Sequence, residues 1–519
     1  MRRGLVHVSV ALAFFFTGAC ASIPPRAGSV SPAPSAPWTP PEAGKMPERA
    51  AAPPVEIPPE YLKPGTTLSL GQLIDIALKN NPATREAWHA ALAAASEVGS
   101  KRSLYYPYVE IDGSILREKQ PLSVGGQFSY LQTTYGPSIA ASWLLFNFGG
   151  READVAEATR ALYAADWTHN AAIQDVVLLV AQAYYQYLNA KAQVVARNAS
   201  LEEARNNLEA AEERHRAGVA TIADELQART AASQVELDLQ DAQGQVQIIR
   251  GALATAVGVS ANVPVDVGEL PQELPLDAVK KTVDELIASA LARRPDLAAE
   301  RFRVLAAESH IHAAAIDGLP SLTLDANGNR TFYWRSGADP FSTNWAGAIT
   351  LRIPVFRGFD TAYQVQKARE EAETARATAE RTEDQVILDV WSSYYAVKTA
   401  SQRVKTTRDL LASATQSAEV AQGRYKAGVG SILDLLTAQS ALAEARSQDA
   451  QARSLWFLSI AQLAHATGML DPTSPEVRSL PALTNPPAPS TPPAPTAPSA
   501  PAVPDAASPT PSSSMKGSS

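Results

Sequence analysis

The sequence predicts an α+β membrane protein in which one unit of long α-helices and paired β-strands occurs twice. Three observations lead to this fold class. Sequence patterns of the first half recur about 210 residues later. Two long stretches without proline are rich in residues that favour helix, such as Ala, Glu, Gln, Arg and Leu. Four segments between the helical stretches alternate apolar and polar residues, which is the pattern of a β-strand with one apolar face.

Residues 1–19 have the pattern of a secretory signal peptide. Two arginines precede the apolar run Val6–Phe16, which is too short for a membrane-spanning helix. Small residues then lead to Cys20, the only cysteine, so an intrachain disulfide is excluded. This arrangement resembles a bacterial lipobox, whose thiol is lipidated, for example with palmitate, and Ala21 after it resembles outer-membrane sorting. Ordinary cleavage nearby, with Cys20 incidental, is the alternative.

Two segments are rich in Pro, Ala and Ser and lack hydrophobic periodicity, namely residues 20–66 and residues 476–519. Such a composition buries too little apolar surface to form a core, so we expect both segments to be extended and largely disordered. The first would be a linker between the lipid anchor and the folded part of the chain, and the second a tail.

The charge and the motif content argue against several classes of function. The formal net charge is −8 and the chain has no basic run, so nothing points to a nucleic-acid partner. No Gly-rich phosphate loop, zinc-type Cys/His cluster or nucleophile-elbow spacing occurs. We therefore expect no cofactor, no bound metal and no enzymatic activity.

The internal duplication covers most of the chain. The stretch LIDIALKNNP at Leu73–Pro82 recurs as LIASALARRP at Leu286–Pro295. This period is far longer than that of short-repeat solenoids, so it indicates a duplicated domain. We assign repeat 1 to residues 67–265 and repeat 2 to residues 266–475.

Each repeat is expected to be mostly helical. Gly149–Arg216 and Phe359–Lys426 contain no proline, and each would be roughly 100 Å long at 1.5 Å per residue. Second helices are expected over Ile222–Val257 and Ile432–Thr467. Helices this long and rich in Ala cannot belong to a compact globule, so we expect them to pack lengthwise in antiparallel pairs.

Four segments are expected to be strands: Tyr105–Ile115, Tyr135–Leu145, Leu322–Asn329 and Trp345–Val355. Strands of about ten residues cross a bilayer when tilted. Aromatic residues near the expected strand ends suit interfacial belts; they are Tyr105, Tyr106, Tyr135, Trp334 and Trp345. The alternative is a soluble β-hairpin half-buried on the helices.

Four strands in one chain cannot close a barrel, because about eight is the smallest number that does. The open edges must then be paired by further copies of the chain. The sequence therefore predicts a transmembrane β-barrel formed jointly by several chains, with eight strands in a dimer or twelve in a trimer.

The order of these elements, repeated after a lipobox, resembles the TolC-type outer-membrane efflux proteins, and in particular their lipoprotein branch. The stretches RHRAGVATIADELQA at Arg214–Ala228 and RYKAGVGSILDLLTAQ at Arg424–Gln439 are similar to the periplasmic tip turns of that family. The resemblance covers residues 67 to 475 and implies a homotrimer in the cell outer membrane. Its joint β-barrel would lie in the membrane lipid, and a long α-helical barrel would extend through the periplasm.

The family resemblance also implies a function. Such a channel is the exit duct of a tripartite efflux system, and it passively conducts small molecules or drugs delivered by a periplasmic adaptor protein and an inner-membrane pump. A channel for type I protein secretion has the same fold and is an alternative. A lipid-anchored periplasmic coiled-coil protein without a pore is an alternative of another class.

The resemblance assigns roles at the two tip turns, near 217–224 and near 427–434. Leu433 and Asp434 match positions of a periplasmic gate, and three copies of Asp434 would form a cation-attracting ring. Asp224 and Tyr425 match positions of an inter-helix latch. Helix capping is the alternative role for both aspartates. Three glycines are expected to reverse the chain with positive φ; they are Gly218, Gly428 and Gly430.

This chain departs from the family pattern at two tip positions. Gly430 stands where the family carries an Arg in the latch, and Thr437 stands where it often carries a second acid. We therefore expect a sparser latch network and easier opening.

Overall fold

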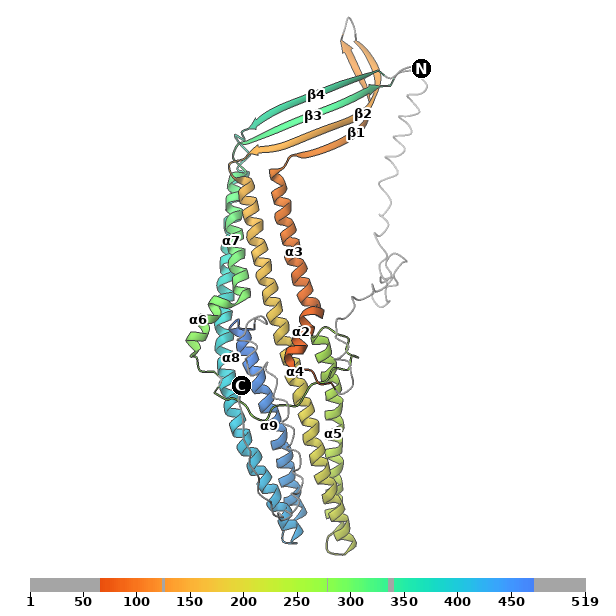
Figure 1. Cartoon of the computed structure of the whole chain (residues 1–519), viewed down its shortest axis with the longest axis vertical. Coiled ribbons are helices and arrows are strands. Elements are labelled where there is room, and N and C mark those ends of the chain that lie inside the picture. Colours follow the sequence, from red (N-terminus) through yellow and green to blue (C-terminus); the bar gives the residue numbers. More distant parts are fainter. Residues whose placement is uncertain (1–65, 124–126, 278, 335–339, 471–519) are drawn as a thin grey trace, which may run out of the picture. The chain divides into compact units, whose positions relative to one another are not determined.

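The computed structural model describes residues 66–123, 127–277, 279–334 and 340–470 (Figure 1). The expected signal peptide, the lipidation site Cys20, all but the last residue of the expected linker and the expected tail lie outside the described residues. Among the helices of the described ranges, none is both long and apolar enough to cross a membrane.

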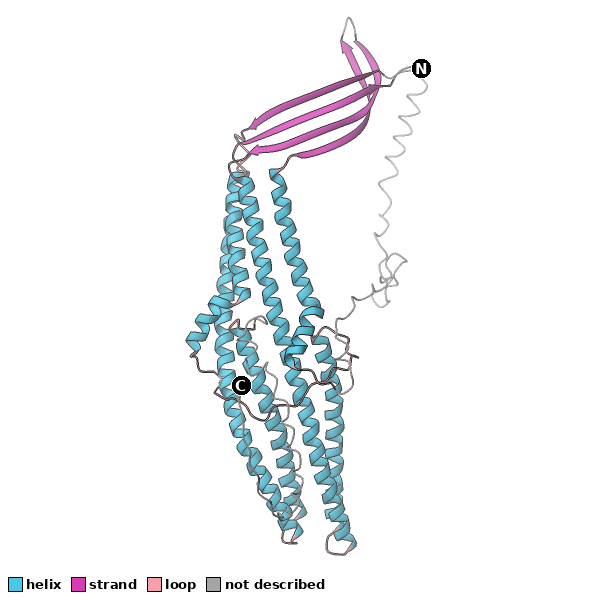
Figure 2. Ribbon diagram, viewed as in Figure 1, coloured by secondary structure: helices cyan, strands magenta, loops and turns pink. Residues whose placement is uncertain are grey.

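The described chain consists mainly of long helices and a β-sheet (Figure 2). The α-helices and strands follow one another in the same order in both halves (Figure 1). The first half contains α2 (Leu70–Asn80), α3 (Pro82–Arg102), the 3-10 turn η3 (Ser103–Tyr105), β1 (Tyr108–Ser123), β2 (Gln127–Phe146), α4 (Gly150–Arg216) and α5 (Ile222–Ala256). The second contains α6 (Val283–Arg293), α7 (Pro295–Ile316), β3 (Ser321–Tyr333), β4 (Phe341–Arg352), α8 (Asp360–Lys426) and α9 (Ile432–Ala466). The internal duplication is confirmed, while the repeat boundary at 265/266 stays a prediction.

The expected helix lengths are confirmed within one residue. Both α4 and α8 are continuous over 67 residues. Their N-caps, Gly149 and Phe359, have left-handed backbone. At the other end, each helix stops at the proline-free but glycine-containing tip turn, where Gly218 and Gly428 have positive φ.

The long helices pack lengthwise in pairs, α4 with α5 and α8 with α9 (Figure 1). Helix α4 also contacts α3, α7 and α9, so it joins elements of both repeats. The largest apolar cluster includes parts of α2, α4, α8 and α9. In it Trp456 is fully buried, its indole N–H donates to the Ser401 hydroxyl at 3.0 Å, and the rings of Tyr185 and Phe457 stack at 5.0 Å.

The four strands form one antiparallel sheet in the order β1-β2-β3-β4. The central pairing of β2 with β3 joins the two repeats, with Ser142 opposite Asp325. Four strands per chain are therefore confirmed, and the two edge strands are β1 and β4.

The strand boundaries differ from those expected. The strands are 16, 20, 13 and 12 residues long, rather than about ten. Tyr105 belongs to η3 and not to β1. Strand β4 ends at Arg352 rather than at Val355, because Pro354 has no backbone N–H to donate to the ladder. Tyr135 and Trp345 lie inside their strands, so the expectation that they mark strand ends is wrong.

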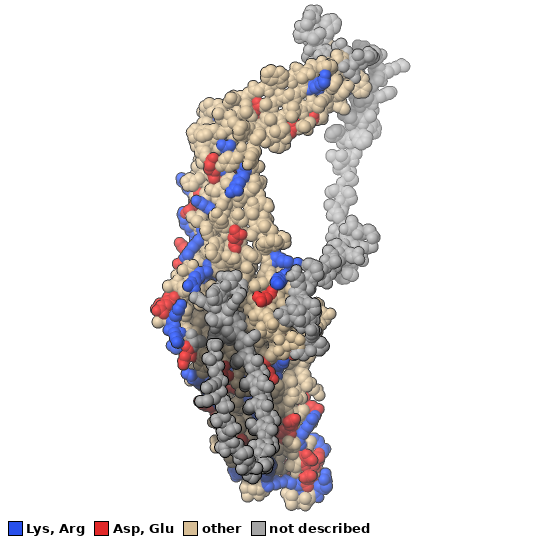
Figure 3. Space-filling model, in the orientation of Figure 1, with Lys and Arg blue, Asp and Glu red and all other residues tan. Residues whose placement is uncertain are grey.

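The two faces of the sheet differ in polarity. On one face Ile111 pairs with Ile139, and Ile115 and Trp345 leave 80% and 85% of their area exposed. On the other face the Ser142 hydroxyl donates to the Asp325 carboxylate at 2.7 Å. Because the apolar face is open, the alternative of a hairpin half-buried on the helices is wrong. Figure 3 shows few charged side chains over the sheet and many over the helices.

Candidate functional site

The two tip turns have the same backbone geometry. In the first turn the Val219 N–H donates to the Arg214 carbonyl at 3.0 Å, and the Gly218 N–H donates to the His215 carbonyl at 2.9 Å. In the second, Val429 and Gly428 make the equivalent bonds to the last turn of α8. This pair of bonds is the Schellman motif, which needs left-handed backbone at the glycine. The prediction of positive φ is confirmed at Gly218 and Gly428.

The expectation of positive φ is wrong at Gly430, whose φ is not positive. Its role is to allow a close approach of the backbone to the end of α8. A Cβ on Gly430 would lie 3.1 Å from the Tyr425 nitrogen, and the Gly430 N–H donates to the Arg424 carbonyl at 3.1 Å. The corresponding position in the first turn is Ala220.

Both tip aspartates cap the helix that follows the turn. The Asp224 carboxylate accepts from the Thr221 backbone N–H and hydroxyl, both at 2.9 Å. The Asp434 N–H donates to the Ser431 hydroxyl at 3.0 Å, and the Asp434 carboxylate accepts from the Ser431 N–H at 3.4 Å. Each is a capping box, so the alternative of a capping role is confirmed for both residues.

The expected latch between Asp224 and Tyr425 is not formed within the described residues of the single chain. The Asp224 carboxylate bonds to Thr221, and the buried Tyr425 hydroxyl has no hydrogen-bond partner among the described residues. The Tyr425 ring packs with Ile432 and Leu435 at the start of α9. The latch stays a prediction for an assembled, closed state.

Leu433 lies beside Asp434 in the first turn of α9 and is 61% exposed. It therefore takes no part in the packing of its own hairpin, and its side chain is available to contact other chains. The neighbouring Ile432 is buried, although its repeat counterpart Ile222 is exposed. The two tips thus share a backbone but differ in their packing.

Arg214, near the end of α4, is a residue whose contacts the sequence reasoning missed. Its guanidinium lies over the Tyr425 ring, 4.4 Å from the centroid, and its Nη2 donates to the Lys426 carbonyl at 3.1 Å. The partners are about 210 residues apart, so no local pattern could have paired them. The first tip has its own charged contacts, with His215 Nδ1 at 2.7 Å from Glu225 and Arg229 at 2.8 Å from the same carboxylate.

The sequence profile described as "Outer membrane efflux protein" matches residues 73–259 and 286–469 of the chain. The chain belongs to the outer membrane efflux protein family. The two matched segments correspond to the two repeats, and they include both tip turns. This efflux protein is an outer-membrane channel, and the family consists of channel proteins rather than enzymes.

Relatives and a solved structure support this assignment. The chain is 27% identical to Protein CyaE of Bordetella pertussis over 73% of its own length and 80% of that protein. It is 25% identical to the probable efflux pump outer membrane protein TtgC of Pseudomonas putida, over 73% and 78% of the two chains. A membrane protein crystal structure from Pseudomonas aeruginosa is similar with 25% identity and a TM-score of 0.69, covering 77% of this chain and 92% of the other.

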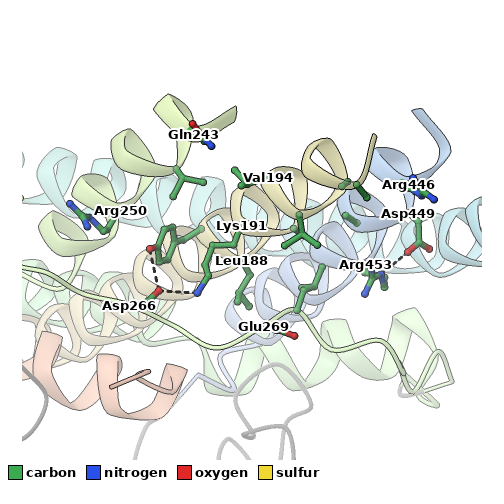
Figure 4. Close-up of a pocket in the computed structure, with 18 of the residues that line it drawn as sticks. Leu188, Lys191, Val194, Gln243, Arg250, Asp266, Glu269, Arg446, Asp449 and Arg453 are labelled. Carbon is green, nitrogen blue, oxygen red and sulfur yellow. Dashed lines mark hydrogen bonds and ion pairs between the residues drawn. The ribbon is translucent and has the colours of Figure 1, made fainter. Parts of the chain in front are cut away.

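A cavity of about 900 Å³ in this efflux protein lies away from the tips, among α4, α5, α9 and the segment 264–272 (Figure 4). Several of its charges pair with one another, such as Lys191 with Asp266 at 2.9 Å and Arg453 with Asp449 at 2.8 Å. Burial would raise the pKa of Asp266, but hydrogen bonding and charge from Lys191 lower it below its usual value. The Lys191–Asp266 pair fixes the inter-repeat segment against α4, whereas the Arg453–Asp449 pair lies within α9. In the described ranges, no group of three or more His, Cys, Asp or Glu side chains is placed to hold a metal ion.

Proposed function

We propose that three copies of this chain form the passive exit duct of a tripartite efflux system, closed at its periplasmic end by the second tip turn. The observation that carries the proposal is the sheet, which has one open apolar face and two edge strands. The apolar face requires an apolar environment, and the edge strands require further strands to pair with. A single chain supplies neither.

The edges support joint assembly. Within the described residues, β1 pairs only with β2 and β4 only with β3, so each leaves one row of backbone groups for another chain. Three sheets joined edge to edge give twelve strands, which is within the range of transmembrane barrels. The apolar face with Ile115 and Trp345 would then face lipid, and the polar face with Asp325 would face the lumen.

The helices support a periplasmic duct. With 67 residues, α4 and α8 are each roughly 100 Å long at 1.5 Å per residue. The tips expose Val219 and Val429, which suits contact with other proteins. The similarity to a probable efflux pump component supports a periplasmic adaptor and an inner-membrane pump as the partners at this end.

We infer that Leu433 and Asp434 line the constriction of the closed duct. Three exposed Leu433 side chains would form an apolar ring that resists wetting, and three Asp434 carboxylates would attract cations. The capping bonds of Asp434 to Ser431 hold its carboxylate in a fixed place without neutralising it.

We also propose that Cys20 carries a lipid anchor in the outer membrane. The support is the sequence pattern of residues 1–20 alone. The anchor would hold the mature N-terminus at the membrane surface.

The test is single-channel recording from the full-length protein in planar lipid bilayers. We expect small, cation-selective openings from the wild type and wider openings from Leu433→Ala. The matched control is Leu226→Ala, the same change at an exposed position of the first tip. Absence of conductance from inserted trimers of both the wild type and Leu433→Ala would refute the duct and favour the coiled-coil alternative without a pore.

A further inference from the structure

We infer that Arg214 ties the two helical hairpins of each chain together at the tip and thereby holds the second tip turn closed. This inference rests on the proposed gate, which it deepens by naming the positioning residue that restrains it. Arg214 belongs to the α4–α5 hairpin, whereas its partners belong to the α8–α9 hairpin.

One side chain makes two contacts across the hairpins. The guanidinium lies 4.4 Å from the centroid of the Tyr425 ring, within the range of a cation–π interaction. Its Nη2 donates at 3.1 Å to the carbonyl of Lys426, the last residue of α8. A carbonyl at a helix C-terminus has no partner within its own helix, so Arg214 satisfies an acceptor that would otherwise need water.

Arg214 makes the contact nearest the tip among several side-chain contacts between the two hairpins. Farther from the tip, Arg446 of α9 pairs with Glu203 of α4 at 3.0 Å, and Asn207 of α4 bonds to Gln439 of α9. Those ties join α4 to α9, whereas α4 and α8 have no extended contact in the described chain. The two contacts of Arg214 therefore decide how far the end of α8 lies from the end of α4.

The two repeats differ at this contact, because the equivalent residues of the other repeat do not form it. The repeat counterpart of Arg214 is Arg424, whose side chain has no hydrogen bond, ion pair or ring contact within the part of the chain that the structure describes. The counterpart of Tyr425 is His215, which faces Glu225 of its own hairpin at 2.7 Å. The first tip thus carries an imidazole that already pairs with a carboxylate where the second tip carries a phenol ring.

The tie also explains the burial of Tyr425, which is only 6% exposed although it lies in the last turn before a surface loop. Arg214 covers one face of the ring, while Ile432 and Leu435 pack with it at the start of α9. Movement of the second tip away from the first would uncover the ring. Closing and opening are therefore coupled to the contact between Arg214 and Tyr425.

The inference is tested by recording single channels from the full-length protein carrying Arg214→Ala, with Arg424→Ala as the matched control. Loss of a cation–π contact and a hydrogen bond in each chain is expected to raise the open probability about tenfold. Arg214→Lys keeps the charge but loses the planar stacking, so an intermediate rise is expected. Arg424→Ala is expected to behave as the wild type.

A double-mutant cycle separates the tie from a general loss of stability. Tyr425→Leu removes the ring but keeps apolar packing, and it is expected to raise the open probability as Arg214→Ala does. The double variant should then add little to Arg214→Ala and should exceed Tyr425→Leu only by the loss of the Lys426 hydrogen bond, because the ring contact is lost only once. Fully additive effects would overturn the inference.

The remaining outcomes distinguish this inference from the proposed gate. If Leu433→Ala widens the pore while Arg214→Ala behaves as the wild type, the tie is refuted and the gate stands. If neither variant changes the conductance of inserted trimers, the gate at the second tip is refuted as well.

Discussion

Gly430 and Arg424 approach so closely at the second tip turn that a Cβ on Gly430 would lie 3.0 Å from the Cβ of Arg424. The same Cβ would lie 3.1 Å from the Tyr425 nitrogen, so the last turn of α8 would have to move to admit it. This approach fixes the path from α8 into α9, and hence the placement of Leu433 and Asp434.

Gly430→Ala is therefore expected to lower the free energy of unfolding by about 1 kcal/mol, the low end of the usual cost of overpacking, because a small shift admits the Cβ and the first turn carries Ala220 at the equivalent position. Gly423→Ala is the control, because a Cβ there meets nothing within 4 Å and the residue lies inside α8. It should raise stability by about 0.5–1 kcal/mol, because alanine loses less entropy than glycine in a helix. Thermal unfolding followed by circular dichroism measures both, and equal effects of the two changes would contradict the assigned role.

The charge of Asp434 and its capping role are separable. In Asp434→Asn the amide oxygen still accepts from the Ser431 N–H, so we expect unchanged stability but reduced cation selectivity. Ser431→Ala removes the capping hydroxyl and keeps the carboxylate, so we expect a loss of about 0.5–2 kcal/mol with selectivity retained. Reversal potentials under a salt gradient measure selectivity. Unchanged selectivity in Asp434→Asn would show that the carboxylate does not line the pore.

The pairing of β2 with β3, which joins the two repeats, depends on Gly136 in β2. A Cβ at this position would lie 1.8 Å from the Arg330 carbonyl oxygen of β3, which is possible only if the two strands separate. Gly136→Ala is expected to cost about 3 kcal/mol or more and to prevent formation of the folded oligomer. Gly113→Ala in β1 is the control, since a Cβ there meets nothing within 4 Å. Electrophoresis of unheated and heated samples measures folding, and an intact oligomer of Gly136→Ala would contradict the pairing.

An ion-pair cluster at the start of α7 predicts a pH dependence of stability. Arg294 is 9% exposed and contacts Asp296 at 2.6 Å and Asp389 of α8 at 2.8 Å. Burial raises the pKa of Asp296, but hydrogen bonds and charge from Arg294 outweigh it, so the pKa lies below the usual value of 3.8. A lowered native pKa stabilises the fold above pH 3.8, and this contribution is lost as the pH falls through the native pKa.

Asp296→Asn should therefore reduce stability at pH 7 by about 1–2 kcal/mol, a discounted value because the Asp296 side chain is 36% exposed. It should also flatten the fall in stability below pH 4. Glu86→Gln, an exposed carboxylate on α3, is the control. Thermal unfolding midpoints measured at several pH values test this, and parallel curves for Asp296→Asn and wild type would contradict it.

The lipid anchor is tested independently of the pore. Cys20→Ser is expected to abolish incorporation of labelled palmitate, because a hydroxyl at this position is not the thiol that the lipobox presents. Ser22→Ala, two residues later, is expected to leave labelling unchanged. Absence of label from the wild-type protein would favour ordinary cleavage with Cys20 incidental.

The backbone of this efflux protein could be predicted closely because its signals are local. The absence of proline and the helix-favouring composition define α4 and α8, and the Schellman glycines end them. The strands were predicted less well, since alternation does not show where hydrogen bonding stops. The length of β2 depends on its pairing with β1 over Gln127–Ser142 and with β3 as far as Phe146, which is a long-range property.

The candidate site, like the fold, could be predicted from the sequence only in part. Sequence alone determined the duplication, from the comparison of the two halves. It also determined the helices and the presence of four strands, and it gave capping as the alternative role of Asp224 and Asp434, because these depend on neighbours within a few residues. Only the tertiary structure showed that Gly430 serves a close approach and that Arg214 lies over Tyr425. The contact of Arg214 with Tyr425 joins two hairpins that are far apart in the sequence, so it forms only when the hairpins pack side by side. The approach of Gly430 to Tyr425 depends on the exact backbone path of the turn, which residue type alone does not specify.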